Sequence, residues 1–254
     1  MLPLYHIFAM NVTMSGMLYK GGKLVTVPMF EPNMFLETML TYRPTTLHLA
    51  PPLVSFLVNH PQVTQDHMAS LRDVLVAAAP TGQTLIDLFL KKFPHVRFRE
   101  GYGMTEMSPA VTMTDLNMKQ TGGSCGQLLP NTKLKVVDLQ TGAELGPGET
   151  GELCFAGPQV MPGYFKNEEA TAQTLIQGWI HTGDIGYYNE VSHRSQRSSY
   201  TFLLPPGGLS LYRGPQEGAD QGERSPGGAR RAGEHNTQHG RSDGCGRHRL
   251  KPVK

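Results

Sequence analysis

The stretch Gly101-Tyr102-Gly103-Met104-Thr105-Glu106 is the most specific signal in the chain, and the fold can be predicted outward from it. It directly follows residues 96–100, an alternating run that predicts a β-strand. Its glycines allow close backbone approach to a ligand, its tyrosine offers a flat face to a purine, and its threonine and glutamate offer oxygens to a phosphate and to Mg²⁺. Taken alone, the stretch is equally compatible with a tight turn in which Tyr102 packs on the sheet and Thr105 and Glu106 cap the next helix.

Strands and helices alternate on the N-terminal side of this stretch. Short apolar runs predict strands, and longer runs of helical period predict helices, with Pro, Gly and Asn at the breaks. The repeated order of strand, helix and strand predicts an α/β fold with a parallel sheet. After residue 122 the pattern changes to short strands separated by Gly and Pro turns, which predicts a small β subdomain. The expected strands are 22–27, 46–50, 74–78, 96–100, 133–138 and 151–155, and the expected helices are 33–42, 53–59 and 83–93.

Two further loops are expected at strand-turn junctions. They are Ala77-Ala78-Ala79-Pro80-Thr81-Gly82 and His181-Thr182-Gly183-Asp184-Ile185-Gly186. In open α/β sheets, ligands bind at the carboxyl ends of the strands. The three loops are therefore expected to converge on one pocket.

Composition indicates a soluble globular protein. Of the 254 residues, 39% are hydrophobic, which is enough apolar sequence for a sizeable core. The net charge is only +2. No apolar run is long enough for a membrane span, and no targeting signal is visible, so an intracellular location, cytoplasmic or peroxisomal, is expected. Cys125, Cys154 and Cys245 are odd in number and widely spaced, which matches neither a disulfide framework nor a zinc-binding pattern.

Residues 191–254 differ in kind from the rest of the chain. They contain 11 Lys and Arg against 5 Asp and Glu, together with 11 Gly and 5 Pro. Such a composition cannot bury enough apolar surface to offset chain entropy, so a disordered tail is predicted. Its basic charge is interpreted as solvated, and a nucleic-acid partner is not expected. A one-base shift of reading frame through residues 214–224 is compatible with Asp-Arg-Lys-Lys-Glu-Leu-Ile-Lys, and Val191-Ser192 is compatible with the start of an intron. The tail is therefore hypothesised to be an aberrant, out-of-frame extension.

Several motifs occur in a fixed order along residues 1–190. They are Leu2-Pro3-Leu4-Tyr5-His6-Ile7-Phe8, Ala78-Ala79-Pro80, Tyr102-Gly103-Met104-Thr105-Glu106, Gly151-Glu152-Leu153, Gly163-Tyr164-Phe165, Trp179 and His181-Thr182-Gly183-Asp184. In these motifs the chain resembles the acyl-adenylate-forming, or AMP-binding, superfamily of acyl-CoA synthetases, 4-coumarate-CoA ligases and firefly-type luciferases. The resemblance implies part of the large N-terminal domain of such an enzyme. The chain is expected to divide into an α/β AMP-binding subdomain over 1–120, a small β-barrel-like subdomain over 121–190 and the disordered tail over 191–254.

The resemblance implies a role for each matching residue. His6, Thr105 and Glu106 would be catalytic, with Glu106 also at the Mg²⁺. The residues implied to border the acid are His6, Phe8, Gly101, Pro109 and Ala110. The residues implied to bind the nucleotide are Ala78, Ala79, Pro80, Gly101, Tyr102, Gly103, Met104, Thr105 and Asp184, with Asp184 at the ribose hydroxyls.

Two of these residues have ordinary structural interpretations beside the functional one. A single histidine among apolar neighbours, such as His6, is more often a satisfied core residue than part of a site. An aspartate that follows a glycine, such as Asp184, is commonly an ordinary turn residue.

As a whole, the resemblance implies a ligase that uses ATP and Mg²⁺ to activate a carboxylic acid as its acyl-AMP and then transfers the acyl group to CoA. In that superfamily a phosphate-binding loop would precede His6, and a hinge with a mobile C-terminal domain would follow residue 190. The chain is therefore expected to be a fragment with little or no activity of its own. Two alternatives stay open: an adenylation domain of a peptide synthetase, and a non-catalytic nucleotide-binding or interaction protein.

Overall fold

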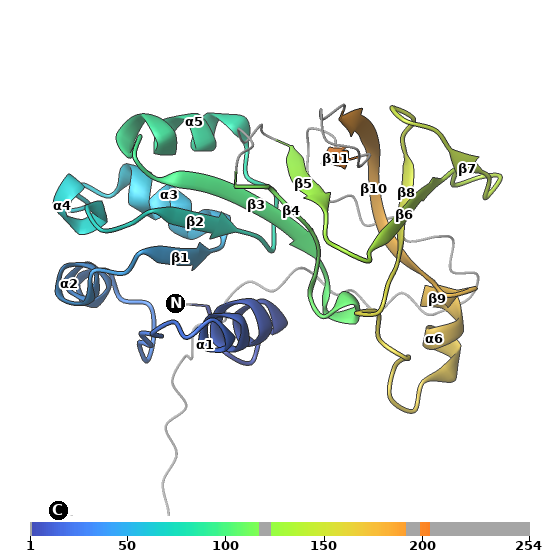
Figure 1. The fold of residues 1–254 in the computed structure, drawn as a ribbon, viewed down its shortest axis with the longest axis horizontal. Helices are drawn as coiled ribbons and strands as arrows, with labels where there is room; N and C mark the ends of the chain where they lie inside the picture. The colour runs from blue at the N-terminus through green and yellow to red at the C-terminus, as the bar shows by residue number, and fades with distance from the viewer. Residues whose placement is uncertain (1, 117–122, 192–198, 204–254) are drawn as a thin grey trace, which may run out of the picture. The chain divides into compact units, whose positions relative to one another are not determined.

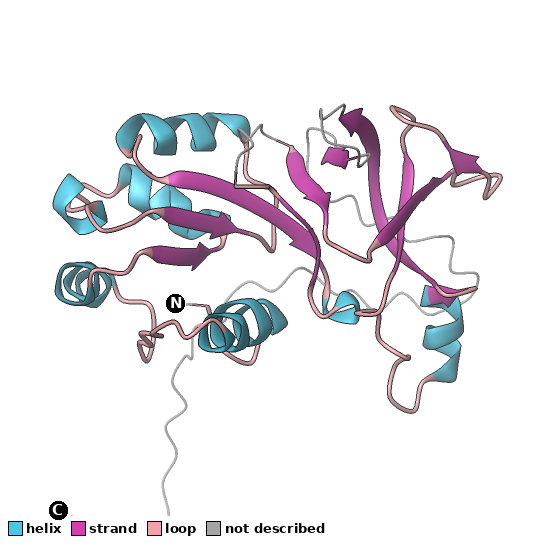
Figure 2. Ribbon diagram, viewed as in Figure 1, coloured by secondary structure: helices cyan, strands magenta, loops and turns pink. Residues whose placement is uncertain are grey.

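The computed structural model describes residues 2–116, 123–191 and 199–203, which form a mixed α/β structure (Figure 1). Figure 2 shows helices gathered around the first three strands and mostly strands in the remainder. The described strands form one sheet in the order β1-β2-β3-β4-β5-β11-β10-β8-β6-β7, and β9 pairs with β10. In the described segments, no helix combines the length and the apolar character needed to cross a membrane.

The first part of the sheet is parallel. Its strands are β1 (Thr46–Leu49), β2 (Asp73–Val76) and β3 (Arg97–Gly103). The helices that accompany them are α2 (Pro32–Tyr42), α3 (Pro51–Asn59), α4 (Gln65–Met68) and α5 (Gln83–Lys92). One buried apolar cluster, which includes Leu49, Phe89 and Phe98, joins these helices to the strands. Burial of such side chains is the main favourable term in folding, so this cluster stabilises the edge on which the predicted loops sit.

The N-terminal segment forms a short wide helix against this sheet. The π-helix η1 (Phe8–Ser15) continues into α1 (Gly16–Tyr19), and the Gly16 amide donates to the Asn11 carbonyl five residues earlier. The Phe8 ring stacks on His48 of β1, with ring centroids 5.9 Å apart. This contact places η1 beside the carboxyl ends of the parallel strands.

The remaining strands are antiparallel. They are β4 (Ala110–Met113), β5 (Ser124–Leu128), β6 (Lys133–Val137), β7 (Glu144–Leu145), β8 (Gly151–Ala156), β9 (Leu175–Ile176), β10 (Trp179–Val191) and β11 (Ser199–Leu203). The short helices here are η2 (Thr105–Met107) and α6 (Glu168–Thr174). A second buried cluster, which includes Tyr102, Leu153 and Phe155, lies among the strands of this part of the sheet.

Most of the predicted elements are confirmed, and three differ from the structure. Residues 22–27, predicted as a strand, have no regular structure, because an apolar run between glycines and a proline still needs a neighbouring strand to pair with. Helix α3 begins at Pro51, since proline is well suited to the first turn of a helix. Strand β3 continues through Gly103, because residues 101–103 pair with β4.

Part of the predicted disordered tail is a strand. Residues 199–203 form β11, which pairs with β10 on one side and β5 on the other. The prediction therefore differs from the structure for these five residues, whose sequence Ser-Tyr-Thr-Phe-Leu is rich in types that favour strands. Residues 192–198 and 204–254, with the hypothesised out-of-frame segment 214–224, lie outside the described residues.

Candidate active site

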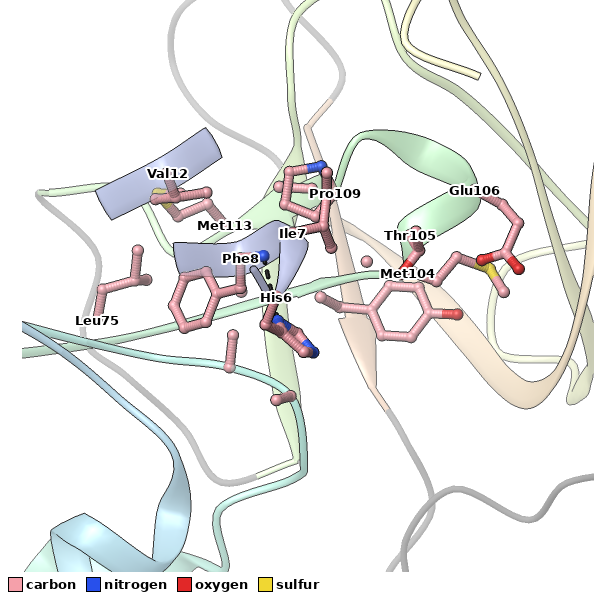
Figure 3. A pocket seen from close by; sticks show the side chains of 16 residues that line it. His6, Ile7, Phe8, Val12, Leu75, Met104, Thr105, Glu106, Pro109 and Met113 are labelled. Carbon is pink, nitrogen blue, oxygen red and sulfur yellow. Dashed lines mark hydrogen bonds between the residues drawn. The ribbon is translucent and has the colours of Figure 1, made fainter. Parts of the chain in front are cut away.

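A cavity of about 250 Å³ opens where η1 meets the ends of the parallel strands. Figure 3 shows Val12, Leu75 and Met113 at one end of it, Glu106 at the other and His6 between them. The residues that line the cavity are His6, Ile7, Phe8, Val12, Leu75, Ala77, Ala78, Gly101, Tyr102, Gly103, Met104, Thr105, Glu106, Pro109, Ala110 and Met113. The site is therefore apolar at one end and polar at the other.

Most of the site residues expected from the sequence meet at this cavity. Ala79 and Pro80 do not line it; both are exposed on the loop that follows β2. Asp184 is also absent from the lining, but it reaches the site through Tyr102. Sequence analysis missed Ile7, Val12, Leu75 and Met113, although the four-residue spacing of Phe8 and Val12 was a usable signal.

Tyr102 and Asp184 are joined by a hydrogen bond between two distant parts of the chain. The Tyr102 hydroxyl donates to Oδ2 of Asp184 at 2.6 Å, and both side chains are buried. Burial, and then the Asp184 charge, raise the pKa of Tyr102 well above its usual value, so the hydroxyl is a neutral donor. Burial also raises the pKa of Asp184; the bond from Tyr102 opposes this shift, and the Glu152 charge adds to it.

Glu106 is held at the polar end of the cavity. Its Oε1 accepts a hydrogen bond from the Tyr164 hydroxyl at 2.7 Å, and its backbone carbonyl accepts from the Met161 amide at 2.8 Å. Among the described residues, no donor contacts its Oε2. The neighbouring Thr105 side chain is exposed. This end of the site therefore presents one hydroxyl and one free carboxylate oxygen.

His6 has a defined ring orientation at the centre of the cavity. Its Nδ1 accepts a hydrogen bond from the Phe8 amide at 3.2 Å, drawn as a dashed line in Figure 3. A neutral ring that accepts at Nδ1 carries its proton on Nε2. Its Nε2–H is therefore able to donate to a ligand. His6 is also exposed, which contradicts the alternative interpretation as a buried core residue.

A buried glutamate holds the loop after β2. Oε1 of Glu100 accepts a hydrogen bond from the Thr81 amide at 3.0 Å, and only 6% of Glu100 is exposed. Loop backbone that lacks strand partners needs such acceptors when it is buried. The contact fixes the loop that carries Ala78 beside the end of β3.

Gly103 is the position in the site where backbone comes closest to backbone. A Cβ atom there would overlap the Pro109 carbonyl oxygen, where the chain turns from β3 into η2 and back to β4. This close approach is the reason that glycine is needed at the centre of the motif.

Comparison with known proteins assigns the family. A family model described as AMP-binding enzyme matches residues 1–165. Curated relatives include 4-coumarate–CoA ligase 2 of Oryza sativa subsp. japonica, 41% identical over 194 residues, and 4-coumarate–CoA ligase 4 of Arabidopsis thaliana, 37% identical over 193 residues. Each match covers 74% of this chain and 34% of the relative, so the chain spans about a third of the length of these relatives.

Solved structures show the same fold. ATP-bound MatB from Rhodopseudomonas palustris matches with a TM-score of 0.70 and 28% identity, over 80% of this chain and 39% of that protein. A long-chain-fatty-acid-CoA ligase from Archaeoglobus fulgidus matches with a TM-score of 0.67 and 26% identity, over 81% and 43% respectively. The described residues thus have the fold of part of the N-terminal domain of adenylate-forming enzymes, and the chain belongs to the AMP-binding enzyme family.

Proposed function

We propose that this chain carries the acid- and nucleotide-binding pocket of an ATP-dependent acid-CoA ligase. Such an enzyme converts a carboxylic acid and ATP to acyl-AMP and pyrophosphate, and then transfers the acyl group to the CoA thiol. The observation that carries the proposal is the Tyr102–Asp184 hydrogen bond beside a cavity that is apolar at one end and polar at the other. The names of the curated relatives, all 4-coumarate–CoA ligases among those compared, support CoA over a carrier protein as acceptor.

The nucleotide would bind on the Tyr102 side of the cavity. Asp184 has one oxygen engaged by Tyr102, so its other oxygen can accept hydrogen bonds from ribose hydroxyls. The Tyr102 ring would stack on adenine, with the loop of Ala78, Ala79 and Pro80 beside it, although only Ala78 lines the cavity. Gly101, Gly103 and Met104 would contribute backbone and side-chain surface to the same subsite.

The acid would bind at the apolar end. Phe8, Pro109 and Ala110 would border it, with Leu75 and Met113 at the far end. His6, with its proton on Nε2, would donate to an oxygen where the acid meets the phosphate. An acid whose remaining part carries no charge fits these side chains best, since burying an unpaired charge among them is unfavourable.

The polar end fits a magnesium ion. Mg²⁺ typically takes one or two carboxylates together with phosphate oxygens and water, and Glu106 offers one free carboxylate oxygen. When bound, the ion would neutralise phosphate charge as the carboxylate attacks. Thr105 would hold the α-phosphate through its exposed hydroxyl.

The proposal is tested by nucleotide binding. AMP and a non-hydrolysable acyl-adenylate analogue are titrated into the protein and its Asp184→Ala variant in a calorimeter. Each hydrogen bond to a charged group contributes about 1.5–3 kcal/mol, so the variant should bind AMP roughly tenfold to a hundredfold more weakly. Asp87→Ala, an exposed position on α5, is the matched control and should not change affinity. Undetectable binding of AMP by the unaltered chain would overturn the proposal. So would an equal AMP affinity in the unaltered chain and in Asp184→Ala.

The chemical step is measured separately. Acid-dependent exchange of pyrophosphate into ATP reports acyl-AMP formation, and release of acyl-CoA reports the transfer. The weak activity expected from the sequence stays a prediction for the first of these assays. Exchange without transfer to CoA would favour the carrier-protein alternative.

A further inference from the structure

Strand β10 is interrupted next to Asp184. His181 pairs with Cys154 of β8 and Ile185 pairs with Glu152, so residues 182–184 face Leu153 alone. Gly183, at the centre of the interruption, has φ +73°, which glycine adopts without strain. The interruption lifts Asp184 out of the regular ladder and toward Tyr102.

Side chains bind the amides that this interruption leaves without strand partners. Oε1 of Glu152 accepts from the Gly183 amide at 2.9 Å. Oγ1 of Thr182 accepts from the Asp184 amide at 3.0 Å and donates to the Leu153 carbonyl at 2.7 Å. Buried amides require such acceptors, so the shape of the 182–184 segment depends on these two side chains.

The Glu152 carboxylate is itself oriented. Its Oε2 lies 2.8 Å from Nδ1 of His181, and Sγ of Cys154 lies 3.4 Å from the same nitrogen. One potential metal-ligand atom from each of the three side chains lies within 4.8 Å of the others, a combination that could hold a metal ion. Each of these atoms already has a hydrogen-bond partner within the group, and Oε1 is engaged by Gly183. The contacts therefore describe a hydrogen-bonded support for the neighbouring segment.

We infer that Glu152 is a positioning residue for nucleotide binding: it holds the Gly183 amide so that the 182–184 segment presents Asp184 to the ribose hydroxyls. The inference rests on the proposed function. Glu152 does not line the cavity, so its effect on a ligand must pass through Asp184. Its loss should therefore weaken only those ligands that Asp184 contacts.

The experiment compares AMP with 2′,3′-dideoxy-AMP, which lacks the ribose hydroxyls. Binding of both is measured by calorimetry for the unaltered chain and for Glu152→Ala, Glu152→Asp and Glu152→Gln. Alanine removes the acceptor and aspartate withdraws it by one methylene, so each should weaken AMP about tenfold and leave dideoxy-AMP unchanged. Glutamine keeps a carbonyl acceptor near Gly183 and should stay within about threefold of the unaltered chain.

A matched control separates this effect from general loosening. Glu149 also binds a glycine amide, that of Gly146, through its carboxylate, in an exposed turn. Glu149→Ala should leave both affinities unchanged. The double variant Glu152→Ala with Asp184→Ala should bind AMP no more weakly than Asp184→Ala alone, because both changes remove the same contact.

The outcomes distinguish the two proposals. Equal loss for AMP and dideoxy-AMP in Glu152→Ala, or additive losses in the double variant, would overturn the positioning role. If the alanine variant fails to fold, the aspartate variant decides the same question. An unaltered chain that binds both nucleotides equally would instead contradict the assignment of Asp184 to the ribose, and with it the proposed function.

Discussion

Asp184 combines a binding role with a cost to folding. Because burial raises its pKa, the ionised carboxylate is less favourable in the folded chain than in the unfolded one. The favourable contribution of this group is therefore present at low pH, below its ordinary pKa, and is lost as pH rises through the raised value. Residues that serve a ligand commonly carry such a penalty.

Asp184→Asn should separate the two effects. Asparagine keeps an acceptor for Tyr102 but has no charge, so the variant should unfold at higher urea concentration than the unaltered chain at pH 7. At a pH where the aspartate is protonated the difference should disappear. AMP affinity should fall about tenfold, since a charged acceptor becomes neutral. A variant that is less stable at pH 7 would contradict this account.

His48 should make the protein sensitive to acid. Burial, with a smaller effect from Arg99, lowers its pKa from 6.5 to about 4, while its Nδ1 lies 2.7 Å from the Thr13 hydroxyl. The stability it contributes is complete above pH 6.5 and is lost as pH falls toward 4. The loss is on the order of 3 kcal/mol.

The measurement is urea unfolding at several pH values, compared with His48→Gln, which does not titrate. The difference between the two proteins should change between pH 6.5 and 4 and be constant above that window. Because Phe8 stacks on His48, helix η1 should also become less well packed as this stability is lost, with or without bound nucleotide. A pH-independent difference would show that His48 titrates normally.

Among the turns, the one between β3 and β4 depends most on a single glycine. Gly103→Ala would force the Pro109 carbonyl away and should destabilise the fold by on the order of 2–4 kcal/mol, with loss of AMP binding. Gly82→Ala is the matched control, because no atom lies within 4 Å of its added Cβ and its φ is −66°. It should change stability by less than about 1 kcal/mol. Equal thermal shifts in the two variants would contradict the close-approach argument.

The sequence predicted those elements whose signals are local. Strands β1, β2 and β6 and helices α2 and α5 each carry a periodic apolar pattern, and the structure confirms them. The sequence predicted a strand-turn junction with a loop over residues 181–186, whereas β10 continues through them. Thr182, Gly183 and Asp184 break the alternation of the strand at the interruption opposite Leu153, so the pattern there is typical of a turn. A pattern of period two cannot register residues that leave the ladder.

The candidate site was predictable to the same degree. Residues on the Gly101 stretch lie in the cavity because one strand and one turn carry them all. Ala79 and Pro80 differ, since the conformation of their loop depends on the distant Glu100 carboxylate. Val12, Leu75 and Met113 come from three separate elements, so only tertiary packing brings them together.

Across the chain, β11 connects the two parts of the sheet. It pairs with β5 and with β10, so removing it would leave two unpaired strand edges. A chain ended after Val191 should therefore unfold at a lower urea concentration than one ended after Leu203, and should form aggregates more readily. The full-length chain is the reference. Identical unfolding of the two truncated chains would show that β11 contributes nothing to stability.

The bond between Tyr102 and Asp184 also has a consequence for how the protein is made. Its partners are 82 residues apart, and ribosomes add about 5–20 residues each second, so Tyr102 is synthesised roughly 4–16 s before Asp184 exists. The first apolar cluster needs only residues between Phe35 and Phe98, and it can assemble during that interval. A nascent chain would thus complete its first core before its ribose acceptor has been translated, and nucleotide could assist only the last stage of folding.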